Sequence, residues 1–133
     1  MLFDDLVATS QAVAATPKRA EKIAQLAQLL ARLAPGEVGA AVAFLSGELP
    51  TGRIGVGWAT LVRAQAVGSA AAPELAIGDV ARFLDELLAM VGEGSSAERA
   101  RRIAAFFARA TAREGDFLGR LLVGELRQAR SRA

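Results

Sequence analysis

The chain has 133 residues, 53% of them hydrophobic and 23% charged, with a net charge of +2 and with neither cysteine nor histidine. This length fits a single domain with its own core, and the missing residue types exclude thiol nucleophiles, imidazole bases and the common zinc sites. No apolar run reaches the roughly 18 to 20 residues of a membrane span. The acidic start at Asp4 and Asp5 is unlike a secretory signal, so we expect a cytoplasmic protein with no membrane partner.

Apolar side chains at helical spacing predict an all-α fold of six or seven helices, the first over residues 2–13. Thr16 and Pro17 have the pattern of an N-cap followed by proline at the first helical position, so a second helix is expected to begin there. A third helix is expected over residues 37–46. The second helix is expected to bury an apolar face made of Ile23, Leu26, Ala27, Leu30 and Leu33.

Residues 47–57 are rich in glycine and predict a loop. A short helix over 58–67, a linker of small residues over 68–73 and an amphipathic helix over 77–91 are expected to follow. Ser95 and Glu98 then have the spacing of a capping box at the start of a further helix. A last helix carries Phe117, Leu118, Leu121 and Leu122.

Positive charge is concentrated at the C-terminal end. Residues 1–94 carry 7 basic and 10 acidic side chains, whereas residues 95–133 carry 9 arginines and 4 acidic side chains, a net charge of +5. The guanidinium group suits forked contacts with phosphate, although a G+C-rich genome also favours arginine over lysine. Two interpretations stay open at this point, a phosphate-binding surface and a solvated charged face.

An internal repeat relates residues 16–49 to residues 96–126, at an offset of 80 that falls to 77 where three residues drop from the turn. Thr16 matches Ser96 as a cap, and Glu37 matches Glu114. Further pairs are Arg19 with Arg99, Ile23 with Ile103, Leu26 with Phe106, Ala27 with Phe107, and residues 44–49 with 121–126. The sequence therefore predicts two helical hairpins related by a pseudo-two-fold axis.

Such a repeat places two capped helix starts and two glycine-bearing turns on the molecule, on one surface if the two-fold relation holds. Free N–H groups and the helix dipole bind phosphate at helix starts, and glycine lets the backbone approach a strand closely. This chemistry suits a sugar-phosphate ligand.

Two stretches resemble the N-terminal DNA-binding domain of ATP-dependent DNA ligases of the bacterial and archaeal type. The first is Phe44-Leu45-Ser46-Gly47-Glu48-Leu49-Pro50 followed by Arg53-Ile54-Gly55-Val56-Gly57. The second comprises Phe106-Phe107, Ala110-Thr111, Glu114, Phe117-Leu118, Arg120-Leu121-Leu122, Gly124 and Leu126-Arg127. The resemblance spans nearly the whole chain.

The resemblance implies an all-helical module that grips duplex DNA, nicked DNA above all, through the minor groove and the phosphate backbone without reading sequence. It implies roles in DNA repair, replication and recombination, nucleoid association in a bacterium, and separate catalytic domains as partners. ATP and Mg are expected only for those catalytic domains, and no cofactor or metal for this chain. The chain contains only Lys18 and Lys22 and no Lys-x-Asp-Gly motif, so we expect no enzyme activity from it alone.

The end of the chain departs from the resemblance, because the family usually continues through a glycine-containing turn into further helices. Residues 1–133 are therefore interpreted as a single helical DNA-binding domain that is a fragment or a truncated form of the family domain.

Residues at the helix starts and glycine-bearing turns are the candidates for DNA contact. They are Thr16, Arg19, Gly52, Arg53, Gly55, Gly57, Ser95, Ser96, Arg99, Gly124 and Arg127. The glycines do not follow the Gly-x-Gly-x-x-Gly order of a nucleotide loop. Trp58, Phe106 and Phe107 are predicted to lie in the core, and Glu114, Asp116 and Glu125 to pair with Arg113, Arg120 and Arg127.

The main alternative is a helical protein-interaction domain whose arginines are only solvated. A transcription-factor helix-turn-helix is less favoured, because no short helix pair presents a polar recognition face.

Overall fold

The structure is a computed structural model, and it describes residues 1–47, 58–66, 68–90, 92 and 94–123. Within these residues the fold is all-α, as predicted, with no strand beyond one isolated bridge between Leu2 and Ala76. The elements are α1 (Phe3–Ala15), α2 (Arg19–Arg32), the 3-10 helix η1 (Pro35–Glu37), α3 (Val38–Ser46), α4 (Trp58–Ala66), α5 (Ile77–Ala89), α6 (Ser95–Ala108) and α7 (Ala112–Val123). None of the described helices is both long and apolar enough to cross a membrane.

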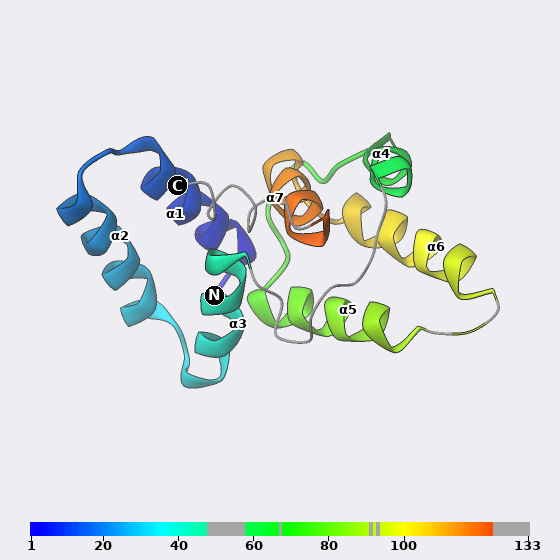
Figure 1. Cartoon of the computed structure of the whole chain (residues 1–133), viewed down its shortest axis with the longest axis horizontal. Helices are drawn as coiled ribbons and strands as arrows, with labels where there is room; N and C mark the ends of the chain where they lie inside the picture. The colour runs from blue at the N-terminus through cyan, green and yellow to red at the C-terminus, as the bar shows by residue number, and fades with distance from the viewer. Residues whose placement is uncertain (48–57, 67, 91, 93, 124–133) are drawn as a thin grey trace.

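The elements are spread along one long axis (Figure 1). Helix α2 lies at one end, α1, α3 and α7 occupy the middle, and α4, α5 and α6 form the other end. Helix α1 packs against α2, α3 and α7, whereas α6 packs against α4 and α5. The first turns of α2 and α6 therefore lie at opposite ends of the molecule (Figure 1).

Aromatic rings join the helices in two groups, one in the middle of the molecule and one at the end formed by α5 and α6. Phe3 of α1 makes edge contacts with Phe44 of α3 and Phe117 of α7, at centroid distances of 6.0 and 5.7 Å. Phe83 of α5 stacks on Phe106 of α6 at 4.0 Å. These five side chains are buried, and so is Phe107, which confirms the core position predicted for Phe106 and Phe107. Because the rings come from both ends of the sequence, the core closes only when the first and last described helices meet.

Backbone hydrogen bonds also tie the chain's beginning to its middle. The N–H of Phe3 donates to the carbonyl oxygen of Leu75 at 2.8 Å, and the N–H of Ile77 donates to that of Met1 at 3.0 Å. These two hydrogen bonds hold the start of α1 beside the start of α5.

The predicted caps at Thr16 and Ser96 are wrong. Helix α2 begins at Arg19 rather than at Pro17, because the backbone of Lys18 is still extended, with ψ 118°. The Thr16 hydroxyl instead accepts a hydrogen bond from the N–H of Lys18 and donates one to Glu21. Helix α6 begins at Ser95 after Gly94, which has φ 78°, so Ser96 lies inside the first turn.

The predicted capping box of Ser95 and Glu98 is also absent, since the N-terminus of α6 has no side-chain cap. The Glu98 carboxylate binds Arg101 and Arg102 instead. Two guanidinium groups on the same helix therefore take the carboxylate that the capping box would need.

The apolar face predicted for α2 is wrong in most of its members. Ile23 is 57% exposed and Leu30 40%, Ala27 is exposed, and only Leu26 and Leu33 are half-buried. The residue of α2 that is buried is Leu29. Helix α2 has α1 as its main neighbour. Its covered side carries Leu29 with the half-buried Leu26 and Leu33, whereas Ile23, Ala27 and Leu30 lie outside it.

Helices form where the two halves of the repeat predict them, as α2 and α3 and as α6 and α7. The second helix of each half follows the predicted register, while the packing of each pair as a hairpin stays a prediction. Glu37 accepts a hydrogen bond at Oε1 from the N–H of Ala34 at 2.9 Å, and Glu114 accepts one from the N–H of Thr111 at 2.8 Å. Phe44 and Leu121, a matched pair, are each 1% exposed. The repeat thus has equivalent hydrogen bonds and core positions, whereas the two-fold axis itself stays a prediction.

Candidate nucleic-acid interface

The predicted DNA-contact residues divide into two groups. Gly52, Arg53, Gly55, Gly57, Gly124 and Arg127 lie outside the described residues, as do Glu125 and the side chain of Trp58. Thr16 and Arg19 lie beside the start of α2, and Ser95, Ser96 and Arg99 lie on the first turns of α6. The structure does not gather these five into one cluster, because the two helix starts are at opposite ends of the long axis (Figure 1).

The start of α2 is a basic cluster of Lys18, Arg19 and Lys22. Lys18 lies 3.9 Å from Glu21, a long and exposed ion pair. Among the residues that the structure describes, neither Arg19 nor Lys22 forms an ion pair, and Arg19 is exposed. Two positive charges therefore stand close to the positive end of the helix dipole, where an anion is favoured.

Lys22 is a candidate that the sequence analysis missed. Its spacing of three residues from Arg19 and four from Lys18 places all three on neighbouring turns of one helix, which the sequence could have indicated.

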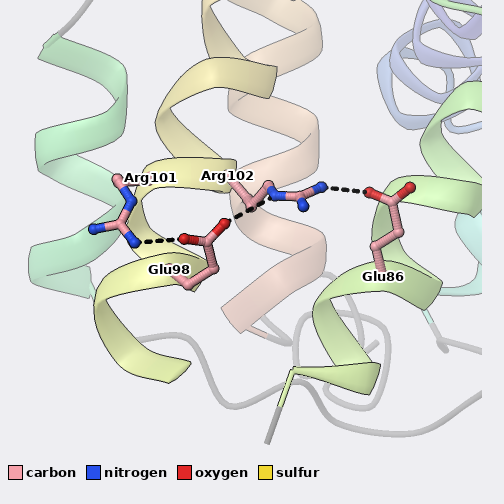
Figure 2. A network of polar contacts seen from close by, with 4 residues as sticks. All are labelled: Glu86, Glu98, Arg101 and Arg102. Atoms are coloured by element: carbon pink, nitrogen blue, oxygen red, sulfur yellow. Dashed lines mark hydrogen bonds and ion pairs between the residues drawn. The ribbon is translucent and has the colours of Figure 1, made fainter. Parts of the chain in front are cut away.

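The first turns of α6 carry an ion-pair network rather than free charge (Figure 2). Glu98 binds Arg101 and Arg102, and Arg102 continues to Glu86 of α5 at 3.2 Å. The hydrogen bond from Arg101, followed by that from Arg102, lowers the pKa of Glu98 below its ordinary value. Of the predicted site residues here, Ser96 is exposed, whereas Ser95 and Arg99 are half-buried.

The excess positive charge of the C-terminal third is partly neutralised by carboxylates from earlier in the chain. Arg109 pairs with Glu74 at 3.0 Å, and Arg113 makes two hydrogen bonds of 2.6 Å to Asp4. The contact with Asp4 is the main cause that raises the pKa of Arg113. Counting charge along the sequence therefore overstates the free positive charge of α6 and α7.

The predicted pairing of carboxylates on the last helix is confirmed at one site and wrong at another. Arg120 lies 3.3 Å from Asp116, as predicted. Glu114 does not pair with Arg113, because it is fully buried and accepts the N–H of Thr111, while Arg113 turns to Asp4. The Thr-x-x-Glu spacing of Thr111 and Glu114 is a capping-box signal that the sequence analysis overlooked.

A hollow of about 270 Å³ lies between α4, α6 and α7, with Gln65, Ser69, Thr111 and Asp116 among its polar lining residues. Of these residues, Asp116 is paired with Arg120. In the described part of the chain, no group of three acidic residues is arranged to hold a metal ion.

Comparison with known proteins identifies relatives that cover nearly the whole chain. The family described as "DNA ligase N terminus" matches residues 63–131. The chain is 50% identical over 130 residues to a "Probable DNA ligase" of Saccharopolyspora erythraea, which covers 96% of this chain and 25% of the relative. It is 51% identical over 129 residues to one from Anaeromyxobacter sp., with the same two shares, and no solved structure matches.

The chain spans about a quarter of the length of these relatives. The family match covers more than half of the chain. About half of the aligned residues are identical to those of the relatives, which is more than a similar composition alone would produce. The chain therefore belongs to the DNA ligase family and matches the N-terminal region of that family.

Proposed function

We propose that this chain binds duplex DNA without reading its sequence, through the phosphate backbone and the minor groove, as the DNA-binding module of an ATP-dependent DNA ligase. The observation that carries the proposal is the match of nearly the whole chain to DNA ligases at about 50% identity. The preferred ligand is nicked duplex, and the roles are those of DNA repair, replication and recombination. Such a protein works in the cytoplasm, at the nucleoid of a bacterium.

The surface chemistry at the start of α2 supports phosphate contact. Arg19 and Lys22 have no carboxylate partner among the described residues, so binding a phosphate there breaks no ion pair of the described fold. Thr16 lies beside them, although its hydroxyl is bound to Glu21. Each basic side chain that neutralises a phosphate releases condensed counterion, which makes such binding strong and dependent on salt.

The first turns of α6 supply the second contact in this proposal, through Ser95, Ser96 and Arg99. Contacts at both ends of a long molecule suit a duplex, which presents phosphates along its length, better than they suit a small ligand. The turn residues Gly52, Arg53, Gly55, Gly57, Gly124 and Arg127 stay predicted contacts.

Ligation itself is assigned to separate catalytic domains of a longer polypeptide, which are the partners of this module. The nucleophilic lysine that ATP adenylates, and Mg, belong to those domains. The two lysines of this chain do not stand in the Lys-x-Asp-Gly motif, so the role of this module is to bind and position DNA.

One titration tests the proposal, with labelled nicked duplex, intact duplex and single strand, each at two salt concentrations. Arg19→Ala and Lys22→Ala are expected to weaken binding to all duplex sequences alike and to make the slope of log affinity against log salt shallower by about 1 each. Arg82→Ala is the matched control, because Arg82 already binds Asp79 on α5. No binding at low salt by the folded chain would remove the proposal.

The alternative of a helical protein-interaction domain has one observation in its favour. Ile23, Leu30 and Val62 are large aliphatic side chains at 57%, 40% and 59% exposure. A chain that is folded but leaves all three DNA probes unbound, with an unchanged salt profile for Arg19→Ala, would support this alternative over DNA binding.

A further inference from the structure

One side of α2 is apolar along its whole length, and its side chains are exposed in the described part of the chain. Its large members are Ile23 and Leu30, and its small members are Ala20, Ala24, Ala27 and Ala31, all of them exposed. These residues recur at steps of three and four, so they form one stripe on the helix. The polar side chains Glu21, Gln28 and Arg32 are exposed on another side. We call these six apolar residues the α2 stripe.

Two positions of the α2 stripe are covered in the matching helix of the repeat. Ile103 and Phe107, which match Ile23 and Ala27, are 1% and 2% exposed. They are buried in α6, which packs against both α4 and α5 (Figure 1). Helix α2 has α1 as its main neighbour, and its buried residue is Leu29. One half of the repeat therefore lacks a covering helix that the other half has.

We propose that the α2 stripe binds an apolar helix from another part of the longer ligase polypeptide, in the position that α4 takes on α6. The relatives supply the length that this requires, since the chain spans only 25% of them. The alanines let the backbone of an incoming helix approach closely, and Ile23 and Leu30 offer aliphatic contact on the same side. The stripe carries no charge, so its partner face is aliphatic or aromatic rather than acidic or basic.

The absence of cysteine in this chain allows a direct test of burial. Ile23→Cys, Leu30→Cys and the control Gln28→Cys are made singly, and the rate of alkylation by iodoacetamide is followed at each site by peptide mass mapping. Each variant is measured as the 133-residue chain and as the same chain replacing the matched quarter of the Saccharopolyspora erythraea relative. The inference rests on the longer polypeptide of the proposed function, but no DNA is added, so the measured rates do not depend on DNA binding.

In the 133-residue chain all three cysteines are expected to react at similar rates, because the three positions are exposed. In the longer polypeptide, reaction at positions 23 and 30 is expected to slow by at least about tenfold, while position 28 changes by less than about twofold, since thiol reactivity follows access. Equal rates in both polypeptides would overturn the proposal. Protection that grows with the concentration of the 133-residue chain would also overturn it, by assigning the stripe to a second copy.

Discussion

Replacing one isoleucine in each half of the repeat tests the packing of this fold most directly. Ile103 of α6 is 1% exposed, whereas its match Ile23 of α2 is 57% exposed. Isoleucine to alanine removes three carbons, worth about 2.4 kcal/mol at roughly 0.8 kcal/mol for each. A partly collapsed cavity adds to this at a buried site, and the better helix propensity of alanine returns about 0.4 kcal/mol. Ile103→Ala is therefore expected to cost about 3 kcal/mol of unfolding free energy.

Ile23→Ala is expected to change the unfolding free energy by no more than about 0.5 kcal/mol, because the exposed isoleucine buries little area and alanine has the better helix propensity. Urea unfolding followed by far-ultraviolet circular dichroism measures both. With a slope of about 2 kcal/mol per molar, the midpoint of Ile103→Ala falls by about 1.5 M. Measurements at two chain concentrations show whether self-association contributes.

Two results would refute this reasoning. A loss above about 1.5 kcal/mol for Ile23→Ala would mean that the α2 stripe is buried in the free chain. A loss below about 1 kcal/mol for Ile103→Ala would mean that α6 is not packed as described, since truncating a buried isoleucine to alanine lowers the unfolding free energy by more than this.

Three further predictions concern the helix ends. Gly47→Ala is expected to lower the unfolding free energy by about 1 kcal/mol, because Gly47 has φ 76°. Gly39→Ala is expected to raise it by up to about 1 kcal/mol, because Gly39 lies inside α3 with open space where a Cβ would be added. Thermal melts check the pair, since the two melting temperatures should shift in opposite directions. Hydrogen bonds from the N-terminal ammonium and then from the N–H of Ala34 lower the pKa of Glu37, so the stability that its carboxylate contributes is present above the ordinary glutamate pKa and is lost as pH falls through the lowered pKa. Glu37→Gln is expected to flatten this acid dependence of the unfolding free energy, measured from pH 3 to 7, and an unchanged profile would contradict the prediction. Ser96→Ala is expected to change stability by less than about 0.5 kcal/mol because Ser96 is no cap, and the loss of about 1 kcal/mol typical of a cap in the same melts would contradict the start of α6.

Much of the fold could be predicted from the sequence because its signals are local. Apolar spacing and glycine runs determined the helical class and the order of the helices. The match of Glu37 to Glu114 predicted positions where both carboxylates accept a backbone N–H three residues earlier. Each of these features depends on residues within one or two turns of each other. The family resemblance rested on the same kind of local pattern, and the relatives confirm it.

The candidate site could be predicted only in part. The basic start of α2 was recognised through Arg19 alone, and Lys22 was missed although it lies one turn away. The caps assigned to Thr16 and Ser96 were wrong, because a hydroxyl before a helical pattern does not reveal whether the next residue is extended. The opposite placement of the two helix starts was also beyond the sequence, since it depends on how α1, α3 and α7 pack between them.

Tertiary structure alone decided which apolar face is covered and where the charges are compensated. Periodicity showed that α2 has an apolar side, yet only Leu26 and Leu33 of that side are half-buried, and the buried residue is Leu29. Arg113 has Glu114 beside it in sequence but binds Asp4, 109 residues away. Burial and ion pairing depend on distance through space, and neither the spacing of side chains along one helix nor a count of charges contains that distance.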